Sequence, residues 1–434
     1  MVNKIKIKFF FLLLILIISC LFIVGIYKFP NDWFGWFLVV LTFIIPLLVT
    51  PFNRNGVWII TVYIILTVYH SCAFINSYIT PTLGADKDAI RFIRNATSIA
   101  ENSNFHFKVG AVVYENFLAL IFKLFGASTF LASELSVVMF LMTLIVLLFL
   151  AKELKMHKYI IPITLLFGFL PSVILFTSVP LRESYQMFFF SSTVFFALKF
   201  INSRKYKFLI ISFLSLFLLG ITHNGLIVAV PFLLLIILLY SVDSEKRKFS
   251  VGIKILLMII FLVLISGAFV LLEARGISSN ASKAVLEGDI LEYAGSYSSP
   301  TNAGRSAYNV YLDTSNPLSI ILTLPIVFLS YMFAPFPWQI RGLLDIYAFF
   351  ESLLRLILVI SIWKTLKIKK GFDKKKYVMV LLLVIILEVI WSTGTQNWGT
   401  AMRHHLPAYG AIVVLGVGGL LKILRIEKVN SSQD

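Results

Sequence analysis

The chain has 434 residues, of which 59% are hydrophobic and only 14% are charged. Soluble globular proteins are about 45–50% apolar and about 25% charged, so this composition excludes an ordinary soluble protein. The formal net charge of +17 does not indicate nucleic-acid binding. No basic stretch is interleaved with aromatic residues as a nucleic-acid groove requires, whereas lysines and arginines concentrate in the cytoplasmic loops of membrane proteins.

The N-terminal segment predicts a membrane-spanning helix that is retained. Its apolar run, Lys8–Tyr27, is longer than the apolar core of a signal peptide, which has about 7–15 residues, and no A-x-A cleavage site follows. A spanning helix needs about 20 apolar residues, and the apolar runs predict an all-α protein with about twelve spans. These are Lys8–Tyr27, Trp33–Thr50, Val57–Ile79, Ala127–Leu150, Tyr159–Thr177, Ser184–Ile201, Phe208–Thr222, Gly225–Tyr240, Val251–Leu272, Asp345–Trp363, Tyr377–Trp391 and Leu406–Leu424.

Two other apolar segments do not fit this alternation, because counting either as a span moves a strongly basic loop to the outer side. We expect Val109–Gly126, which contains Glu115 and Lys123, to form an amphipathic helix on the outer leaflet. Leu318–Trp338 is interrupted by three prolines, and we expect it to be re-entrant or tilted. Irregular backbone is tolerated at membrane depth where protein shields it or where it lines a wet cavity.

The basic segments set the predicted orientation. They fall on one side of the predicted spans and read KIKIK, KELKMHK, NSRKYK, SEKRK, KTLKIKKGFDKKK and KILRIEK. By the positive-inside rule that side is the cytoplasm, which also receives both termini. We therefore expect one integral membrane domain over residues 1–434, with a first outer loop over 80–126 and a second over 273–316.

Two acids, Asp86 and Asp88, begin a predicted surface helix in the first outer loop. A carboxylate there can act as a general base or hold a metal ion. Acids in the first turn of a helix also bind its free N–H groups. We expect one of the two to cap the helix, and the other is a candidate catalytic residue.

Arg182 and Glu183 lie side by side after Pro180, where a predicted span begins. Two separate structural roles explain them: Glu183 complements the helix N-terminus, and Arg182 reaches lipid headgroups. An arginine at headgroup depth also suits a phosphate ligand, because its planar guanidinium binds oxygen atoms in pairs. We predict that Arg182 binds phosphate and that Glu183 is catalytic or orients Arg182.

Histidines and an arginine occur at two further outer turns. His223 lies in a tight turn between spans, where it is structural or, given its pKa near neutrality, a catalytic residue. Arg403, His404 and His405 together suit an anion, whereas Trp398 beside them is also typical of an interfacial anchor. We predict Trp398, Arg403 and His404 as substrate ligands. Adjacent histidines on a helix diverge by about 100°, which does not match a zinc site.

Aromatic residues and arginines flank the proline-interrupted segment. They are Arg305 and Tyr308 before it, and Trp338 and Arg341 at and after its end. Aromatic rings offer apolar faces to sugar rings, and arginines contact phosphates or hydroxyl groups, so we predict these four as substrate ligands. Packing and interfacial anchoring explain the same residues.

Some charged residues fall inside predicted spans, and those near the outer ends bear on the site. Glu351 and Arg355 are four residues apart on one predicted helix and can neutralise each other. Glu388 lies near the outer end of its own span and is a minor candidate.

No nucleotide or metalloprotease motif occurs, since the sequence lacks GxxxxGK[ST], a GxGxxG after a strand and HExxH. The two cysteines, Cys20 and Cys72, form neither a zinc pattern nor a disulfide framework. We expect no cofactor. A divalent metal held by Asp86 and Glu183 is compatible with the sequence but not indicated by it.

Four stretches, together with the layout of spans and outer loops, carry a resemblance to a known family. They are GADKDAIRFIRNA, YENFLALIFKLFG, LPSVILFTSVPLRES and NWGTAMRHHLPAYGAIVVLGVGGL. The chain resembles bacterial membrane glycosyltransferases of the GT-C type and the related O-antigen and exopolysaccharide polymerases. The second outer turn of sugar transferases usually carries Asp, where this chain has Glu183, and that departure favours a polymerase.

The resemblance implies a sugar donor linked to polyprenyl (di)phosphate, such as an undecaprenyl-linked one, and a glycan acceptor that reacts with it at the outer face of the cell membrane. It implies polysaccharide-assembly proteins as partners and no nucleotide-sugar site. Arg182, Arg403 and Arg305 would stabilise the lipid phosphate that leaves. Asp86, Glu183 or His223 would take the proton of the acceptor hydroxyl.

The alternative is a transporter or flippase of lipid-linked or polar substrates. Charged residues within the membrane and broken helices are typical of transporters too. The sequence shows no clear internal repeat, and its polar residues gather at one face rather than at the midplane, which favours the enzyme. A structural subunit is a third hypothesis.

Overall fold

The computed structural model describes residues 19–20, 22–82, 86–106, 108–242 and 304–424, together with Gly252, Leu256, Ile259 and Gly288. Helices form nearly all of the regular structure in these ranges, as predicted. The β-structure among them is a single bridge between Ala307 and Asn397. The chain divides into two compact units. The first comprises Met1–Phe107, Ala111–Ile145 and Thr164–Tyr185, and the second comprises Lys108–Gly110, Val146–Ile163 and Gln186–Asp434.

The first unit contains three long apolar helices or helix parts, namely α2 (Trp33–Leu48), α3 (Gly56–Tyr78) and the first part of α6 (Thr129–Glu153). The Asn55 side chain starts α3 by accepting a hydrogen bond of 3.2 Å from the backbone N–H of Trp58, the usual arrangement at a helix N-cap. In the core of this unit, Tyr69 stacks on Phe140 with their centroids 3.9 Å apart.

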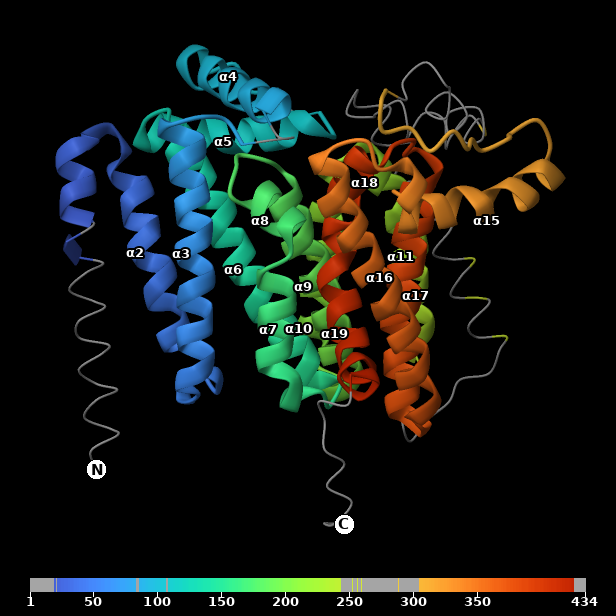
Figure 1. The fold of residues 1–434 in the computed structure, drawn as a ribbon. Helices are drawn as coiled ribbons and strands as arrows, with labels where there is room; N and C mark the ends of the chain where they lie inside the picture. Colours follow the sequence, from blue (N-terminus) through green and yellow to red (C-terminus); the bar gives the residue numbers. More distant parts are fainter. Residues whose placement is uncertain are drawn as a thin grey trace. The chain divides into compact units, whose positions relative to one another are not determined.

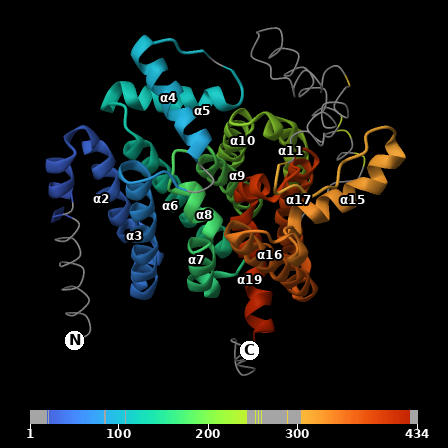
Figure 2. The same cartoon turned by 45° about the horizontal axis from the view of Figure 1, so that its top comes forward.

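Two further helices of the first unit, α4 (Asp86–Asn102) and α5 (Ala111–Phe125), pack against each other. Phe92 of α4 meets Tyr114 of α5 edge to face, with ring centroids 5.1 Å apart. Both helices lie across the ends of the long helices of their unit (Figures 1 and 2). The 15 residues of α5 rise about 22 Å, less than the roughly 30 Å of a bilayer core, so the helix is too short to span upright.

The second unit is built around α19 (Leu406–Ile423), which is buried along most of its length. Against it packs α16 (Leu343–Ile368), and Figure 2 shows the two helices side by side. Glycines permit the close approach: a Cβ atom added at Gly419 would lie 2.3 Å from the backbone oxygen of Ser361 on α16. The other helices of this unit are α9 (Glu183–Ser203, from Gln186 on), α10 (Tyr206–Ile221), α11 (Asn224–Val242), α15 (Pro317–Phe333), α17 (Gly371–Thr393) and α18 (Trp398–His404).

Five helices are long and apolar enough to cross a membrane, which indicates a multi-pass membrane protein. They are Pro30–Leu48, Gly56–Tyr78, Thr129–Glu153, Gly371–Thr393 and Leu406–Ile423. A sixth is added if His157–Gly168 and Pro171–Thr177, which are bent by 65° relative to each other, form one span.

The prediction of about twelve spans is therefore supported only in part. The predicted span Val251–Leu272 and most of Lys8–Tyr27 lie outside the described residues. The helices α10, α11 and α15 are apolar but shorter than 18 residues over their apolar stretch. The helices α9 and α16 have sufficient length, but neither is among the candidate spans.

The proline-interrupted segment forms α15 and then breaks. The helix ends at Phe333, just before Pro335, and the short 3-10 helix Pro337–Gln339 follows. Within its unit, α15 lies at a steep angle to α16 and α17 (Figure 1).

Candidate functional site

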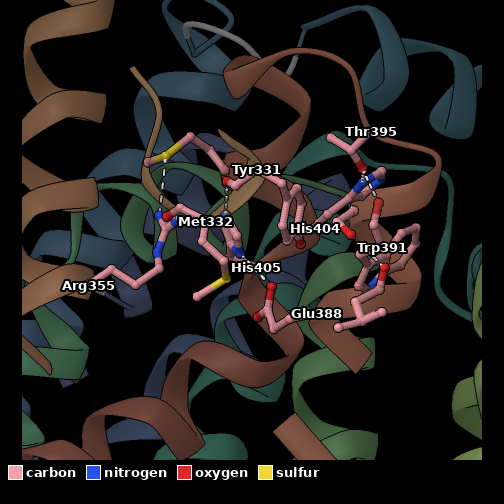
Figure 3. Close-up of polar contacts among 11 residues, drawn as sticks. Tyr331, Met332, Arg355, Glu388, Trp391, Thr395, His404 and His405 are labelled. Atoms are coloured by element: carbon pink, nitrogen blue, oxygen red, sulfur yellow. Dashed lines mark hydrogen bonds and ion pairs between the residues drawn. The ribbon is translucent and has the colours of Figure 1, made fainter. Parts of the chain in front are cut away.

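The second unit contains a cluster of buried ionisable side chains, which we call the Arg355 cluster (Figure 3). It comprises Arg355 on α16, Glu388 on α17 and His405 between α18 and α19. Their exposed fractions are 1%, 1% and 0%. Burying a charge costs several kcal/mol unless partners compensate it, and ionisable residues among membrane helices commonly mark functional sites.

The hydrogen bonds of His405 show which of its ring nitrogens carries a proton. Its Nε2 lies 3.1 Å from the backbone oxygen of Tyr331, which can only accept, so Nε2 carries a proton. Its Nδ1 lies 2.7 Å from Oε2 of Glu388. One further proton is therefore shared between imidazole and carboxyl, either as an ion pair or as a neutral pair.

The environment of His405 opposes its positive charge. Burial lowers the pKa of His405, and nearby Arg355 lowers it further, while Glu388 and the Tyr331 carbonyl act in the opposite direction. The other oxygen of Glu388, Oε1, is buried and accepts no hydrogen bond from a described residue. The Tyr331 hydroxyl lies near this carboxyl, and it too makes no hydrogen bond within the described residues.

Arg355 has few acceptors for its five N–H donors. Its Nη1 donates to the backbone oxygen of Met332 at 2.8 Å, and its Nη2 lies 3.8 Å from Sδ of Met402. The guanidinium lies 5.2 Å from the ring centroid of Tyr409. Glu351 lies four residues before Arg355 on α16, and the mutual neutralisation of the two charges stays a prediction. The hydrogen bond to Met332 O joins α16 to α15.

Tyr308, a predicted substrate ligand, reaches the same cluster. Its backbone N–H donates to Gln396 O at 2.9 Å, which fixes the segment beside the α17–α18 turn. Burial raises the pKa of Tyr308 well above its ordinary value, while Arg355 lowers it and Glu388 raises it. Its hydroxyl is therefore within electrostatic reach of both residues, and it makes no hydrogen bond within the described part of the chain.

His223 and His404, both predicted site residues, meet at Trp391 of α17. His404 stacks on the Trp391 ring at 3.9 Å, and His223 contacts the same ring edge to face at 4.6 Å. The hydroxyl of Thr395 donates to Trp391 O at 2.7 Å, so it accepts from Nδ1 of His404, which is also 2.7 Å away. Figure 3 shows Trp391, Thr395 and His404 beside the Arg355 cluster.

Arg305, Arg341 and Trp398 converge on Asp345, a buried carboxylate at the start of α16. Arg305 donates from both terminal nitrogens at 2.7 and 3.1 Å, Trp398 donates from Nε1 at 2.9 Å, and the Arg341 backbone N–H donates at 3.0 Å. These hydrogen bonds stabilise the buried carboxylate in its charged form. Arg305 thus binds a carboxylate of its own chain, and its side chain remains 51% exposed.

The two other predicted ligands of this unit lie nearer the surface. Trp338 is 78% exposed and stacks on Phe336 with centroids 5.1 Å apart. Arg403 is half-buried on α18.

Arg182 and Glu183 belong to the first unit, where Arg182 lies near an aromatic ring. Glu183 is buried at the first turn of α9, and the guanidinium of Arg182 lies 5.9 Å from the centroid of Phe92. Burial raises the pKa of Tyr114 well above its ordinary value, and the charges of Tyr185 and Glu183 raise it further. Glu183 therefore lies near the Tyr114 hydroxyl, in a setting of low polarity.

The two acids of the first outer loop begin α4, as predicted. Asp86 is its first residue. Asp88 forms an ion pair with Arg91, three residues on, at 3.1 Å, and both side chains are partly exposed. This pair is a local surface contact of the helix.

Sequence reasoning missed a buried chain of polar groups in the first unit. Nδ1 of His70 lies 2.7 Å from Oε2 of Glu134, and its Nε2 lies 2.8 Å from Oγ1 of Thr42. These residues come from α3, α6 and α2, and each helix is a candidate span. The sequence does show a histidine and a glutamate in two separate apolar runs. Their pairing could not be predicted, because it depends on which faces of the two helices are in contact.

Among the described residues, no group of three or more His, Cys, Asp or Glu side chains could hold a metal ion. Comparisons with known proteins found no match: no protein-family model, no curated protein and no solved structure matches this chain.

Proposed function

We propose that this protein is a membrane glycosyltransferase of the polymerase type, which uses sugars linked to polyprenyl (di)phosphate. The observation that carries the proposal is the Arg355 cluster, in which a buried guanidinium lies near a carboxyl–imidazole pair and a tyrosine hydroxyl. Such a transfer requires a cation for the leaving phosphate and a base for the acceptor, both shielded from water. The proposal includes about twelve spans, cytoplasmic termini and a reaction at the outer face.

The proposed step breaks the bond between the anomeric carbon of the donor and its phosphate oxygen. A new bond joins that carbon to the acceptor hydroxyl oxygen, and the electron pair of the broken bond leaves with the lipid (di)phosphate. The acceptor proton passes to Oε1 of Glu388. This protonation would leave the Glu388–His405 pair positively charged next to Arg355, and the anionic leaving group would offset that charge.

Two other groups of residues have supporting roles in this proposal. Arg403 and Arg305 lie on segments of the same unit, where they would bind donor or acceptor. Arg182 and Glu183 form a separate candidate pair in the first unit, whose contribution needs its own test.

The test uses the purified protein in liposomes with a lipid-linked oligosaccharide and no nucleotide sugar. We expect glycan elongation that falls by about 10²–10⁴-fold in Glu388→Gln, because a general base contributes about that factor. Arg355→Lys keeps the charge but loses the planar donor set, and we expect at least a tenfold loss. Glu101→Gln, an exposed acid at the end of α4, is the matched control.

Two outcomes of this test would contradict the proposed role of the Arg355 cluster. Elongation that persists in both variants would refute the role of the Arg355 cluster. A loss confined to Glu183→Gln would transfer the role to the first unit. The unfolding temperature of each variant separates loss of chemistry from loss of fold.

A transporter is the second candidate, and the buried pairs Glu388–His405 and His70–Glu134 favour it. Ionisable pairs among apolar helices are typical of proton pathways. Movement of a lipid-linked sugar across the liposome membrane without elongation would support this function and contradict the enzyme.

A further inference from the structure

We infer that the second unit holds a phosphate-binding site, which we call the lysine pocket, at the end of α16 and α19 that is remote from the Arg355 cluster. The pocket is a cavity of about 140 Å³. Four of its lining side chains are lysines, namely Lys155, Lys158, Lys369 and Lys422. Nothing in the proposed glycosyl transfer uses it.

Its place in the fold separates it from the candidate site. Thr365 lines the pocket and follows Arg355 by ten residues on α16, which corresponds to a rise of about 15 Å. Gly418 and Lys422, near the end of α19, form another wall. The positive-inside rule places this end of both helices in the cytoplasm, opposite to the predicted outer side.

The lysines of the pocket converge from three segments distant in sequence. Lys155 and Lys158 lie between α6 and α7 (Ile160–Gly168), Lys369 follows α16, and Lys422 is on α19. Lysines in cytoplasmic loops and in the last turns of helices have ordinary roles in topology and in offsetting helix dipoles. Those roles do not require four ammonium groups around one cavity.

One acidic side chain, Asp373, offsets part of the charge beside the pocket. Lys155 forms an ion pair of 2.7 Å with Asp373, which also pairs with Lys376 at 2.9 Å. Lys369 donates to the backbone oxygen of Leu154 at 2.9 Å. Burial lowers the pKa of Lys369; Asp373 raises it, and Lys376 and Lys155 lower it. A bound anion would relieve this crowding of like charges.

The size and the lining identify the chemical class of the ligand. Drug-sized ligands occupy pockets of about 300–1,000 Å³, so this cavity is too small for a nucleotide but has room for a phosphoryl group. Lysine binds phosphate as a point charge, and basic pockets between membrane helices bind anionic lipid headgroups. A lipid headgroup and a soluble phosphate compound share this chemistry.

The test places the full chain in nanodiscs of phosphatidylcholine and measures binding by calorimetry. One arm titrates inorganic pyrophosphate, and the other titrates short-chain phosphatidylglycerol. We expect saturable binding in at least one arm, and the responding arm identifies the source of the phosphate. The variant Lys158→Gln/Lys422→Gln, whose two side chains are exposed, should weaken that binding at least tenfold.

The matched control is Lys364→Gln/Lys367→Gln, which removes two exposed charges from α16 outside the pocket lining. We expect less than a twofold change for this control. Equal weakening by both double variants would show that general surface charge binds the probes, and it would overturn the lysine pocket. Absence of saturable binding in both arms would overturn it as well.

Discussion

Arg355, Glu388 and His405 are ionisable side chains from separate elements, and each is almost fully removed from solvent. Their packing leaves a guanidinium with one carbonyl acceptor and a carboxyl oxygen without a hydrogen-bond donor among the described residues. Unused hydrogen-bonding capacity of this kind costs about 1–3 kcal/mol for each buried group. A bound substrate that supplies the missing hydrogen-bond partners would offset this cost.

We predict that His405 makes the stability of the protein depend on pH. Its folded-state pKa lies below the ordinary 6.5, so below that pH the unfolded chain binds more protons than the folded one. The unfolding temperature should therefore fall as the pH decreases from about 6.5 toward the folded-state pKa. Thermal unfolding between pH 7 and pH 5 should show a smaller decrease in His405→Gln.

His157, an exposed histidine, provides the control for this measurement. The variant His157→Gln should retain the full pH dependence. If His405→Gln and the unmodified protein lose stability in parallel, His405 does not bind its proton as the structure implies. The charged and titratable groups that face His405 are Glu388, Arg355 and Tyr331.

The proximity of site residues could be predicted from the sequence only where the residues lie in turns at the same end of the predicted spans. His223 and His404 lie in turns at the same end of the predicted spans, and the structure places both against Trp391. Arg305 and Trp398 likewise converge, but on Asp345, which was not predicted as a site residue. The pairing of Glu388 with His405 depends on the rotation of α17 about its axis, which hydrophobic periodicity does not resolve in a helix buried on most sides.

At the scale of helices, the polar chain Thr42–His70–Glu134 joins α2, α3 and α6 within the first unit. The Thr42 hydroxyl donates to Val39 O at 2.7 Å, so it accepts from Nε2 of His70. The interaction is therefore directional across three helices. Apolar contacts alone do not fix such a register, since lipid tails are as apolar as the helix faces.

We predict that His70→Leu destabilises the protein by about 3–5 kcal/mol, because it leaves Glu134 buried without its partner. The double variant His70→Leu/Glu134→Leu should recover most of that loss, since a buried pair replaced by apolar residues is often neutral. Unfolding in denaturant would measure both values. Additive losses in the double variant would mean that the two residues do not interact.

The helix boundaries were largely predictable, and the misses have local causes. The segment Val109–Gly126 was expected to form a non-spanning helix, and α5 covers Ala111–Phe125. The predicted span Tyr159–Thr177 is bent instead, because Gly168 ends one helix and Pro171 begins the next. Proline favours the first turn of a helix and cannot continue a preceding one.

At the scale of the whole chain, the basic loops predict which ends of the helices face the cytoplasm. Exposed positions allow a direct test in a background that carries Cys20→Ser and Cys72→Ser. We predict that a membrane-impermeant maleimide added to intact cells labels Ser315→Cys, which precedes α15. Lys205→Cys, between α9 and α10, should react only after the cells are permeabilised.

Reversed labelling at these two positions would invert the orientation. It would place the Arg355 cluster at the cytoplasmic face and contradict the proposed use of a lipid-linked donor outside. The lysine pocket would then lie outside, where the calorimetric test would still apply to it. The number of spans was the least predictable property, since α16 combines spanning length with buried charges.

The hydrogen bonds of Asp345 also have an evolutionary consequence. Its carboxylate depends on donors from Arg305, Trp398 and the backbone of Arg341, so three stretches of sequence are constrained by one side chain. A lineage that lost Arg305 would retain a buried acid with too few donors, and selection would then favour a neutral residue at position 345. Among related sequences, substitutions at positions 305 and 345 should therefore occur together. A suppressor screen that starts from Arg305→Ala should recover substitutions of Asp345.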